Sequence, residues 1–238
     1  MKVIIIAGGL GTRISEETED KPKPMVLIND KPIIWHLMNI FCLQGLNEFV
    51  ISTGYKSEVI ENWVQKNQIL DSNSKQMNIK TVNTGLHTQT GGRISEVMKT
   101  LKNEQVIATY GDGLANISIK KLLAFHSAHG KLATVTAVRP PARFGYMKIE
   151  NTKVTHFGEK NQSDEGWING GFFVLDPKVA AYVESVNEPF ETGALVRLSN
   201  ESNLMAYHHE GFWQPMDTLR EKRELESEAS LETPAWLK

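Results

Sequence analysis

A run of β-branched residues, Val3–Ile6, leads directly into the glycine-rich segment Ala7–Arg13 near the start of the chain. The run predicts a buried strand, and the glycines predict a turn whose backbone can approach a ligand closely, because glycine has no Cβ. Arg13 ends this segment, and Lys21 and Lys23 follow soon after, so positive charge is available for phosphate groups. These features together favour an α/β fold that holds a polyphosphate where its first strand ends.

The spacing around this turn excludes two common glycine-loop motifs. The chain contains no Gly-x-x-x-x-Gly-Lys-Ser/Thr string, so the turn is not a Walker loop. Gly9-Leu10-Gly11 is followed by Thr12-Arg13-Ile14, so the third glycine of a dinucleotide fingerprint is absent. An ordinary strand-ending turn would account for the glycines, but it would not account for the basic residues beside them. The sequence therefore indicates a phosphate-binding loop of another class.

Composition limits the partners that the chain is expected to have. The 238 residues carry a formal net charge of −2, and no long run of one charge occurs, which argues against general binding to nucleic acid or to a membrane surface. The single cysteine, Cys42, has no partner for an intrachain disulfide. No apolar stretch approaches the ~20 residues of a membrane span, and Met1 leads directly into the first strand. A cytoplasmic protein with no membrane or nucleic-acid partner is predicted.

Strand-like and helix-like segments alternate through the first half of the chain, which predicts a mixed, mainly parallel sheet flanked by helices. Helices are expected near residues 33–44 and 57–66. In the second half, residues 144–157 and 168–175 have the pattern of short strands joined by turns, and they predict a small antiparallel β layer over the site. Because no linker or repeat divides the chain, one domain over residues 1–238 is expected.

Two aspartates are candidates for a metal site. Asp112 lies in Tyr110–Gly113, at the predicted end of a strand, and ligands of open α/β sheets bind beyond such ends. Magnesium bound with a nucleotide usually takes one or two carboxylates in addition to phosphate oxygens. Asp217, in the segment Gly211–Thr218, is the second candidate. The two residues together predict a site for Mg²⁺.

The chain resembles the glucose-1-phosphate cytidylyltransferases, a family of sugar nucleotidyltransferases, in six segments spread over almost its whole length. These segments are Ala7–Arg13, Pro22–Met25, Thr90–Arg93, Tyr110–Gly113, Ile168–Phe173 and Gly211–Thr218. The first two are shared by the whole sugar nucleotidyltransferase superfamily, whereas the last two point to the cytidylyl branch. The resemblance implies a Rossmann-like three-layer α/β fold. It also implies Mg²⁺-dependent transfer of a cytidylyl group from CTP to a sugar 1-phosphate, with glucose 1-phosphate as the expected acceptor.

The resemblance also implies, by position, that the first half of the chain, about residues 1–115, binds the nucleotide. The backbone from Ile6 to Leu10 is expected to read the pyrimidine, and Lys23 is expected to contact the α-phosphate. The residues implied to bind the nucleotide are Ile6, Ala7, Gly8, Gly9, Leu10, Gly11, Thr12, Arg13, Lys23, Thr88, Arg93 and Gly111. The residues implied to be catalytic are Arg13, Lys23, Asp112 and Asp217, of which the two aspartates bind Mg²⁺.

The second half, about residues 116–238, is implied to bind the sugar phosphate. The residues that the resemblance gives for this pocket are Gly145, Glu159, Lys160, Asn169 and Gly170. Two departures from the family pattern lie on this side: Asn161 follows Lys160 where proline is usual, and Ala194 replaces the usual proline in Glu191–Leu195. A different phosphorylated acceptor therefore stays open as an alternative.

The stretch between about residues 66 and 84 is shorter than in typical cytidylyltransferases, which carry a β-insertion there that is linked to hexamer contacts. A homo-oligomer smaller than a hexamer is therefore expected. Transfer from UTP or dTTP stays open, because backbone groups can read either cytosine or uracil. A non-catalytic regulatory subunit that binds a nucleotide sugar is an alternative of another class.

Overall fold

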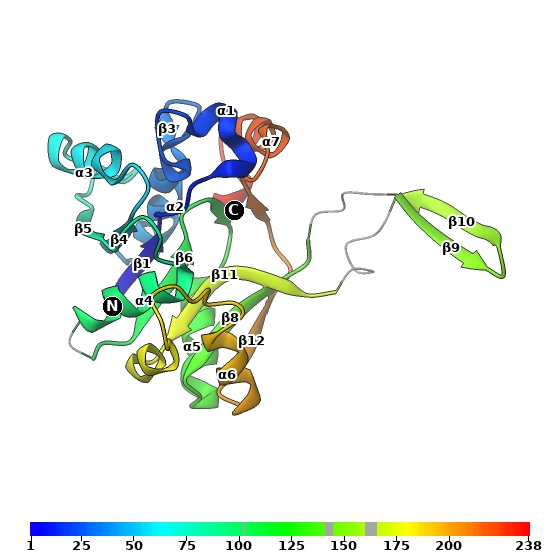
Figure 1. Cartoon of the computed structure of the whole chain (residues 1–238). Helices are drawn as coiled ribbons and strands as arrows, with labels where there is room; N and C mark the ends of the chain where they lie inside the picture. Colours follow the sequence, from blue (N-terminus) through cyan, green and yellow to red (C-terminus); the bar gives the residue numbers. More distant parts are fainter. Residues whose placement is uncertain (102, 141–144, 160–165) are drawn as a thin grey trace.

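In the computed structural model, the β-branched run forms strand β1 (Lys2–Ile6), which lies inside the main sheet (Figure 1). The structure describes residues 1–238 except 102, 141–144 and 160–165. For residues 145–149 and 156–159 it describes the backbone alone.

The other elements follow β1 in chain order. The strands are β2 (Leu27–Ile28), β3 (Lys31–Pro32), β4 (Glu48–Thr53), β5 (Asn78–Asn83), β6 (Val106–Tyr110), β7 (Gly113–Ala115), β8 (Ala133–Val138), β9 (Gly145–Glu150), β10 (Lys153–Glu159), β11 (Ile168–Leu175), β12 (Leu204–His209) and β13 (Trp213–Pro215). The α-helices are α1 (Ser15–Thr18), α2 (Ile33–Cys42), α3 (Ser57–Lys66), α4 (Thr90–Lys99), α5 (Ile119–His129), α6 (Ala194–Asn200) and α7 (Leu219–Ala229). The 3-10 helices are η1 (Thr12–Ile14), η2 (Lys23–Met25), η4 (Pro177–Tyr182) and η5 (Ala235–Leu237).

The main sheet has seven strands in the order β12-β8-β11-β6-β1-β4-β5. Strand β1 pairs in parallel with β4 and β6, β4 with β5, and β8 with β12. Strand β11 runs antiparallel to both of its neighbours, β6 and β8. The sheet is therefore mixed and mainly parallel, as the sequence predicts.

Helices cover both faces of this sheet. Val3 and Ile5 of β1 belong to an apolar cluster that includes side chains of α2, α3, α5 and α7. Ile4 and Ile6 point to the other face and belong to a second cluster, with side chains of α4, η4 and α6. Because successive side chains of a strand point to opposite faces, one short apolar run is buried in two cores. The predicted three-layer α/β fold is confirmed.

Three small antiparallel sheets accompany the main sheet: β2–β3, β7–β13 and β9–β10. The β9–β10 hairpin extends away from the body (Figure 1), and its strands pair with each other. Strand β11, predicted to belong to a layer over the site, is instead a member of the main sheet, because its apolar segment Phe172–Leu175 is buried there. The small antiparallel sheet that reaches the candidate site is β7–β13.

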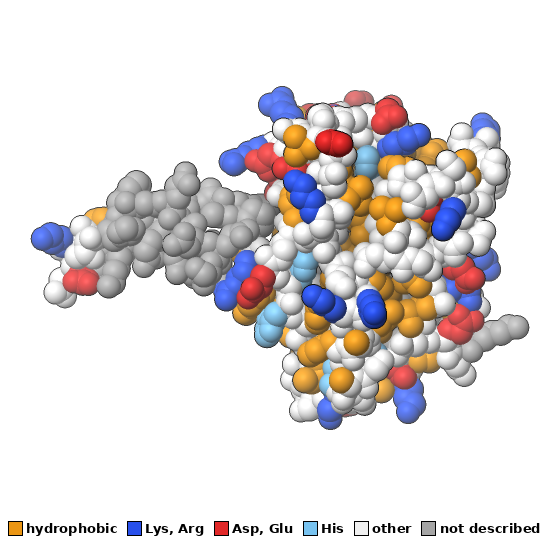
Figure 2. All heavy atoms as spheres, turned by 180° about the vertical axis from the view of Figure 1, so that it is seen from behind, with side chains coloured by type: hydrophobic (Ala, Val, Ile, Leu, Met, Phe, Trp, Pro, Cys, Tyr) orange, Lys and Arg blue, Asp and Glu red, His pale blue; other side chains and the backbone are white. Residues whose placement is uncertain are grey.

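The surface of the body agrees with the weak net charge of the sequence. Acidic and basic side chains are interspersed on the face shown in Figure 2, with no broad area of one sign. Helices of the described part of the chain all lack the length and apolar character that a membrane crossing requires. Near the C-terminal end of the chain, Trp236 is 2 % exposed and packs into the first apolar cluster.

Candidate active site

The glycine-rich turn follows β1 at the carboxyl end of the sheet. Gly11 has a φ angle of +66°, in the left-handed region that favours glycine, and it leads into η1. A Cβ atom on Gly8 would lie only 2.1 Å from the Nη1 atom of Arg93. Gly8 is therefore needed to make room for a basic side chain that comes from α4.

Arg93 is 3 % exposed. Its guanidinium group donates hydrogen bonds to the carbonyl oxygens of Gly8 (2.9 Å) and Thr53 (2.9 Å) and to the hydroxyl of Thr84 (2.7 Å). These partners are neutral, and burial lowers the pKa of Arg93 from its usual value. The site thus holds a fixed positive charge that can interact with an anionic ligand in the adjoining cavity.

Four charged side chains meet where β6 ends. Lys23 Nζ donates to Asp112 Oδ2 and to Asp217 Oδ1, each at 2.6 Å. Arg13 Nη1 donates to Asp217 Oδ2 at 2.9 Å. Lys23 is 8 % exposed, whereas most of the Arg13 side chain is in solvent. The four residues predicted to be catalytic therefore form one cluster.

The β7–β13 sheet brings the two aspartates together. Asp112 directly precedes β7, and Asp217 follows the end of β13 by two residues. Pro215 pairs with Gly113, and the N–H of Met216 donates to the carbonyl oxygen of Asp112 at 2.9 Å. The spacing of the two carboxylates is therefore fixed by backbone pairing.

A residue that the sequence analysis did not identify, Glu221, holds the backbone of Asp217. Its Oε2 atom accepts the N–H groups of Asp217 (2.7 Å) and Thr218 (2.9 Å). Thr218 and Glu221 form a capping box at the start of α7, and Glu221 is 6 % exposed. The spacing Thr218-x-x-Glu221 directly after Asp217 is a signal in the sequence that could have revealed it.

Electrostatic coupling within the cluster changes two pKa values. Burial opposes the charged form of Lys23, but the two carboxylates outweigh it, so the pKa of Lys23 is raised. Burial would also raise the pKa of Asp217, but Lys23 and Arg13 outweigh that effect, and this pKa is lowered. Both groups are therefore kept in their charged forms at neutral pH.

The donor set fits a divalent cation. Asp112 and Asp217 each place one oxygen 2.6 Å from the same ammonium nitrogen, so the two carboxylates already surround a position for a cation. Carboxylate oxygens are the hard ligands that Mg²⁺ prefers, and phosphate oxygens usually complete its shell. Among the residues that the structure describes, no cluster of three or more His, Cys, Asp or Glu side chains offers a more complete protein site.

A cavity of about 350 Å³ adjoins this cluster and contains most of the predicted nucleotide residues. The predicted residues that line it are Ile6, Ala7, Gly9, Gly11, Thr12, Arg13, Lys23, Thr88, Arg93 and Gly111. Two predicted residues do not line this cavity. Gly8 is packed against Arg93, and Leu10 is 53 % exposed. The first half of the chain therefore assembles the predicted pocket almost completely.

A second cavity, of about 650 Å³, lies on the other side of the charged cluster. It shares Arg13, Tyr110, Asp112 and Asp217 with the first cavity. Asn169 and Gly170 line it, as predicted for the sugar-phosphate pocket, and Trp213 Nε1 donates to the carbonyl oxygen of Gly170 at 2.9 Å. Two ligands bound in these cavities would meet at the charged cluster.

The structure describes less of the other predicted sugar-phosphate residues. Gly145 and Glu159 pair through their backbones at the base of the β9–β10 hairpin. Lys160 lies outside the described residues.

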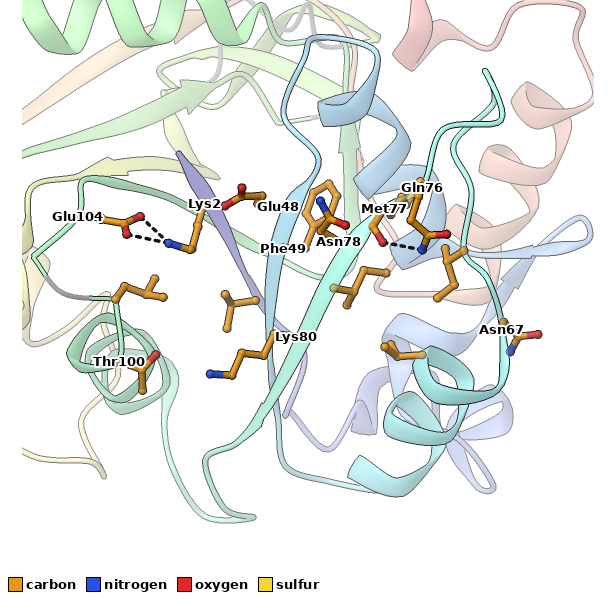
Figure 3. Close-up of a pocket in the computed structure, with 15 residues that line it drawn as sticks. Lys2, Glu48, Phe49, Asn67, Gln76, Met77, Asn78, Lys80, Thr100 and Glu104 are labelled. Atoms are coloured by element: carbon orange, nitrogen blue, oxygen red, sulfur yellow. Dashed lines mark hydrogen bonds and ion pairs between the residues drawn. The ribbon is translucent and has the colours of Figure 1, made fainter.

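A larger cavity, of about 700 Å³, lies at the opposite, amino end of the strands (Figure 3). Its charged lining residues are Lys2, Glu48, Lys80 and Glu104. Lys2 and Glu104 form an ion pair at 2.6 Å, and Phe49 and Met77 contribute apolar walls. No sequence motif singled out above lies there.

Comparison with known proteins shows the family to which the chain belongs. The model of the nucleotidyl transferase family matches residues 2–219. The chain is 43 % identical to a glucose-1-phosphate cytidylyltransferase from Salmonella typhi over 243 residues, which cover 95 % of each protein. It is 40 % identical over 236 residues, or 92 % of each protein, to a probable glucose-1-phosphate cytidylyltransferase from Bacillus subtilis. Among solved structures, HddC from Yersinia pseudotuberculosis has a similar fold, with a TM-score of 0.72, 24 % identity, and coverage of 96 % of this chain and 99 % of that one.

Proposed function

The chain belongs to the nucleotidyl transferase family and, within it, to the glucose-1-phosphate cytidylyltransferases, and we propose that it transfers the cytidylyl group of CTP to glucose 1-phosphate. The products are CDP-glucose and pyrophosphate. The observation that carries this proposal is the position of the Lys23–Asp112–Asp217 cluster at two cavities that share Asp112 and Asp217. A group can pass directly from one bound ligand to another only where their two cavities meet.

We assign the smaller cavity to CTP. The backbone from Ile6 to Leu10 would read the base, and Gly11–Arg13 would hold the β- and γ-phosphates. Arg93 supports this assignment, because the described residues pair its buried charge with neutral oxygens, so that it can attract an anion. Lys23 would contact the α-phosphate, where charge changes during the transfer. The larger neighbouring cavity, with Asn169 and Gly170, would take the sugar phosphate.

The reaction is an in-line displacement at the α-phosphorus of CTP. A phosphate oxygen of glucose 1-phosphate forms a new bond to that phosphorus, while the bond to the bridging oxygen of the β-phosphate breaks and pyrophosphate leaves. The second pKa of a phosphate monoester is near ~6, so the attacking oxygen is ionised at neutral pH and needs no general base. The barrier arises from bringing two anions together, and Arg13 and Lys23 lower it by positioning and charge.

We propose that Asp112 and Asp217 hold Mg²⁺. When bound, the ion would supply positive charge to the triphosphate. A cation between the two carboxylates would take the place that the ammonium group of Lys23 has in this structure. Lys23 would then be free to contact the α-phosphate.

Pyrophosphate release tests the proposed function. The protein is incubated with each of four nucleoside triphosphates and a panel of phosphorylated sugars and polyols, with Mg²⁺ or with a chelator. We expect Mg²⁺-dependent release with CTP and glucose 1-phosphate. Release with UTP or dTTP, or with a different acceptor, would change the assigned substrates but would still agree with the in-line displacement. Binding of a nucleotide sugar without release in any combination would favour the regulatory subunit.

Assembly and location remain part of the proposal. We propose a homo-oligomer smaller than a hexamer, because the segment between residues 66 and 84 is short, and light scattering at several protein concentrations would measure the mass. A reaction that consumes a nucleoside triphosphate agrees with the cytoplasmic location predicted from the sequence.

A further inference from the structure

Glu191 lies in the turn before α6 and joins the walls of the two cavities. Its Oε2 atom accepts a hydrogen bond from Thr90 Oγ1 at 2.7 Å, and its Oε1 atom accepts one from the hydroxyl of Tyr110. Thr90 lines the cavity assigned to CTP, of about 350 Å³, and Glu191 lines the cavity assigned to the sugar phosphate, of about 650 Å³. Tyr110 lines both, and these two are called the smaller and the larger cavity below. The hydroxyl of Thr90 also accepts the N–H of Phe190 at 2.8 Å, which holds the turn against the start of α4. The carboxylate therefore has a fixed position and two fixed donors.

These contacts determine the direction of the Tyr110 proton. An ordinary tyrosine keeps its phenolic proton at neutral pH, so the Tyr110 hydroxyl is a neutral group with one proton to donate. Because a carboxylate only accepts, this proton points to Glu191. The hydroxyl oxygen accepts the Nδ2 group of Asn169 at 3.1 Å, and one of its lone pairs is left over. Tyr110 can therefore offer the larger cavity an acceptor but no donor.

Asn169 is oriented by a second contact. Its Oδ1 atom accepts the N–H of Gly171 at 2.9 Å, which directs Nδ2 to Tyr110 and leaves one Nδ2 hydrogen unused by these partners. An acceptor on Tyr110 and a donor on Asn169 thus lie 3.1 Å apart on the cavity wall. Two hydroxyl groups on adjacent carbons of a sugar ring can satisfy such a pair, since one hydroxyl donates and the other accepts.

We propose that Glu191 is a positioning residue for the acceptor sugar: it holds the Tyr110 hydroxyl as an acceptor, so that Tyr110 and Asn169 read two adjacent ring hydroxyls. This inference rests on the proposed function, because it assigns the larger cavity to the sugar phosphate. It gives Glu191 a role that is exerted through Tyr110, and it predicts which acceptor sugars the site prefers. Phosphorylated compounds that lack one of the two hydroxyls are discriminated against at this wall.

A near-isosteric substitution separates this role from a structural one. In Glu191→Gln the side chain keeps its size but has one acceptor oxygen and one donor nitrogen, so the Thr90 and Tyr110 hydroxyls cannot both donate to it. We expect the KM for glucose 1-phosphate to rise about tenfold or more and the KM for CTP to stay within about twofold. Monodeoxy glucose 1-phosphates supply a second measurement. At least one of them should bind to the wild-type protein about tenfold more weakly than glucose 1-phosphate, and Glu191→Gln should reduce that difference.

A double-mutant cycle tests whether Glu191 acts through Tyr110. In the Tyr110→Phe background, Glu191→Gln should have no further effect on the KM for glucose 1-phosphate. Equal effects in both backgrounds, or a matching rise in the KM for CTP, would overturn the inference. Glu201→Gln is a matched control, because Glu201 accepts from the hydroxyl of Tyr182, which also accepts from Asn203, away from both cavities. That control should behave as the wild-type protein does.

Calorimetric binding of glucose 1-phosphate keeps this test separate from that of the proposed function. If the wild-type protein binds glucose 1-phosphate but releases no pyrophosphate, the proposed reaction fails, and the affinities of the same variants still decide the role of Glu191. If Tyr110→Phe does not fold, as seen from its melting temperature, the monodeoxy series on Glu191→Gln decides it. An unchanged difference between glucose 1-phosphate and its deoxy analogues would then contradict the inference.

Discussion

The two ends of the central sheet carry cavities of different chemistry. At the carboxyl end, Lys23 and Arg13 are paired with half-buried carboxylates from other parts of the chain. At the amino end the cavity is larger, but its surroundings are ordinary: Lys2 pairs with Glu104, while Glu48 and Lys80 are exposed and form no ion pair within the described residues (Figure 3). The two ends therefore differ in that interdependent charges occur at the end to which we assign the reaction, whereas the larger cavity lies at the other end.

The largest effect is expected from Asp112→Asn, at the carboxyl end. The change removes one charge of the cluster and keeps the shape of the side chain. We expect the turnover number to fall about a hundredfold, which corresponds to ~3 kcal/mol, with little change in melting temperature. Pyrophosphate release and thermal unfolding measure the two quantities. Near wild-type release would remove Asp112 from the mechanism.

Arg93→Met tests the fixed charge beside the nucleotide pocket. The change removes the charge and the hydrogen bonds to the carbonyl oxygens of Gly8 and Thr53, so we expect the KM for CTP to rise about thirtyfold and stability to fall by ~2 kcal/mol. Arg93→Lys keeps the charge but cannot reach all of these oxygens, so its effect should be intermediate. Steady-state kinetics and denaturant unfolding measure the changes. A change in stability without any change in the KM for CTP would make Arg93 purely structural.

Lys23→Ala should separate turnover from metal affinity. The ammonium group of Lys23 lies where a cation would bind, so its removal leaves the two carboxylates unneutralised. We expect the free protein to bind Mn²⁺ about tenfold more tightly, although turnover is largely lost. Electron paramagnetic resonance of unbound Mn²⁺ measures this affinity without nucleotide. Weaker binding would show that Lys23 does not compete for the cation position.

Glu221→Ala removes the carboxylate that holds the backbone of Asp217. We expect the Mg²⁺ concentration for half-maximal activity to rise about fivefold and stability to fall by ~1 kcal/mol, since a capping interaction is lost. Glu224→Gln, an exposed change on the same helix, is the control. Equal Mg²⁺ requirements in both variants would limit Glu221 to helix stability.

The smallest effect is expected at the amino end. Lys80→Glu reverses an exposed charge in the amino-end cavity that forms no ion pair within the described residues, and we expect KM and turnover to change by less than about twofold. A larger change would break the contrast between the two ends, and it would indicate that the amino end communicates with the site.

The sequence allowed good prediction of elements with a strong local pattern. The helix expected at residues 57–66 matches α3, and the one expected near 33–44 differs from α2 at its end alone. Strand β5 was missed, because Ile79 and Val82 are the two apolar residues of Asn78–Asn83 and are not spaced two apart, so this edge strand gives no alternating signal. Local pattern identifies buried strands and amphipathic helices better than half-exposed edges.

The residues of the candidate site also fall into two groups, those that a sequence motif predicted and those that no motif predicted. Lys23, Asp112 and Asp217 were predicted because they lie in recognisable motifs, and the structure confirms that they meet. The contact between Glu191 and Tyr110 was not predicted, since their side chains become neighbours through the packing of a turn against α4 and β6. A sequence pattern reveals motifs more readily than it reveals tertiary contacts.

The β7–β13 pairing has a consequence for the order in which the protein is made. Lys23 and Asp217 are separated by 194 residues, so β13, the partner strand of β7, leaves the ribosome long after the glycine-rich turn. The glycine-rich turn can therefore be complete in a nascent chain that has Asp112 but not yet Asp217. Activity is expected to begin abruptly, when the segment around residue 217 emerges and pairs.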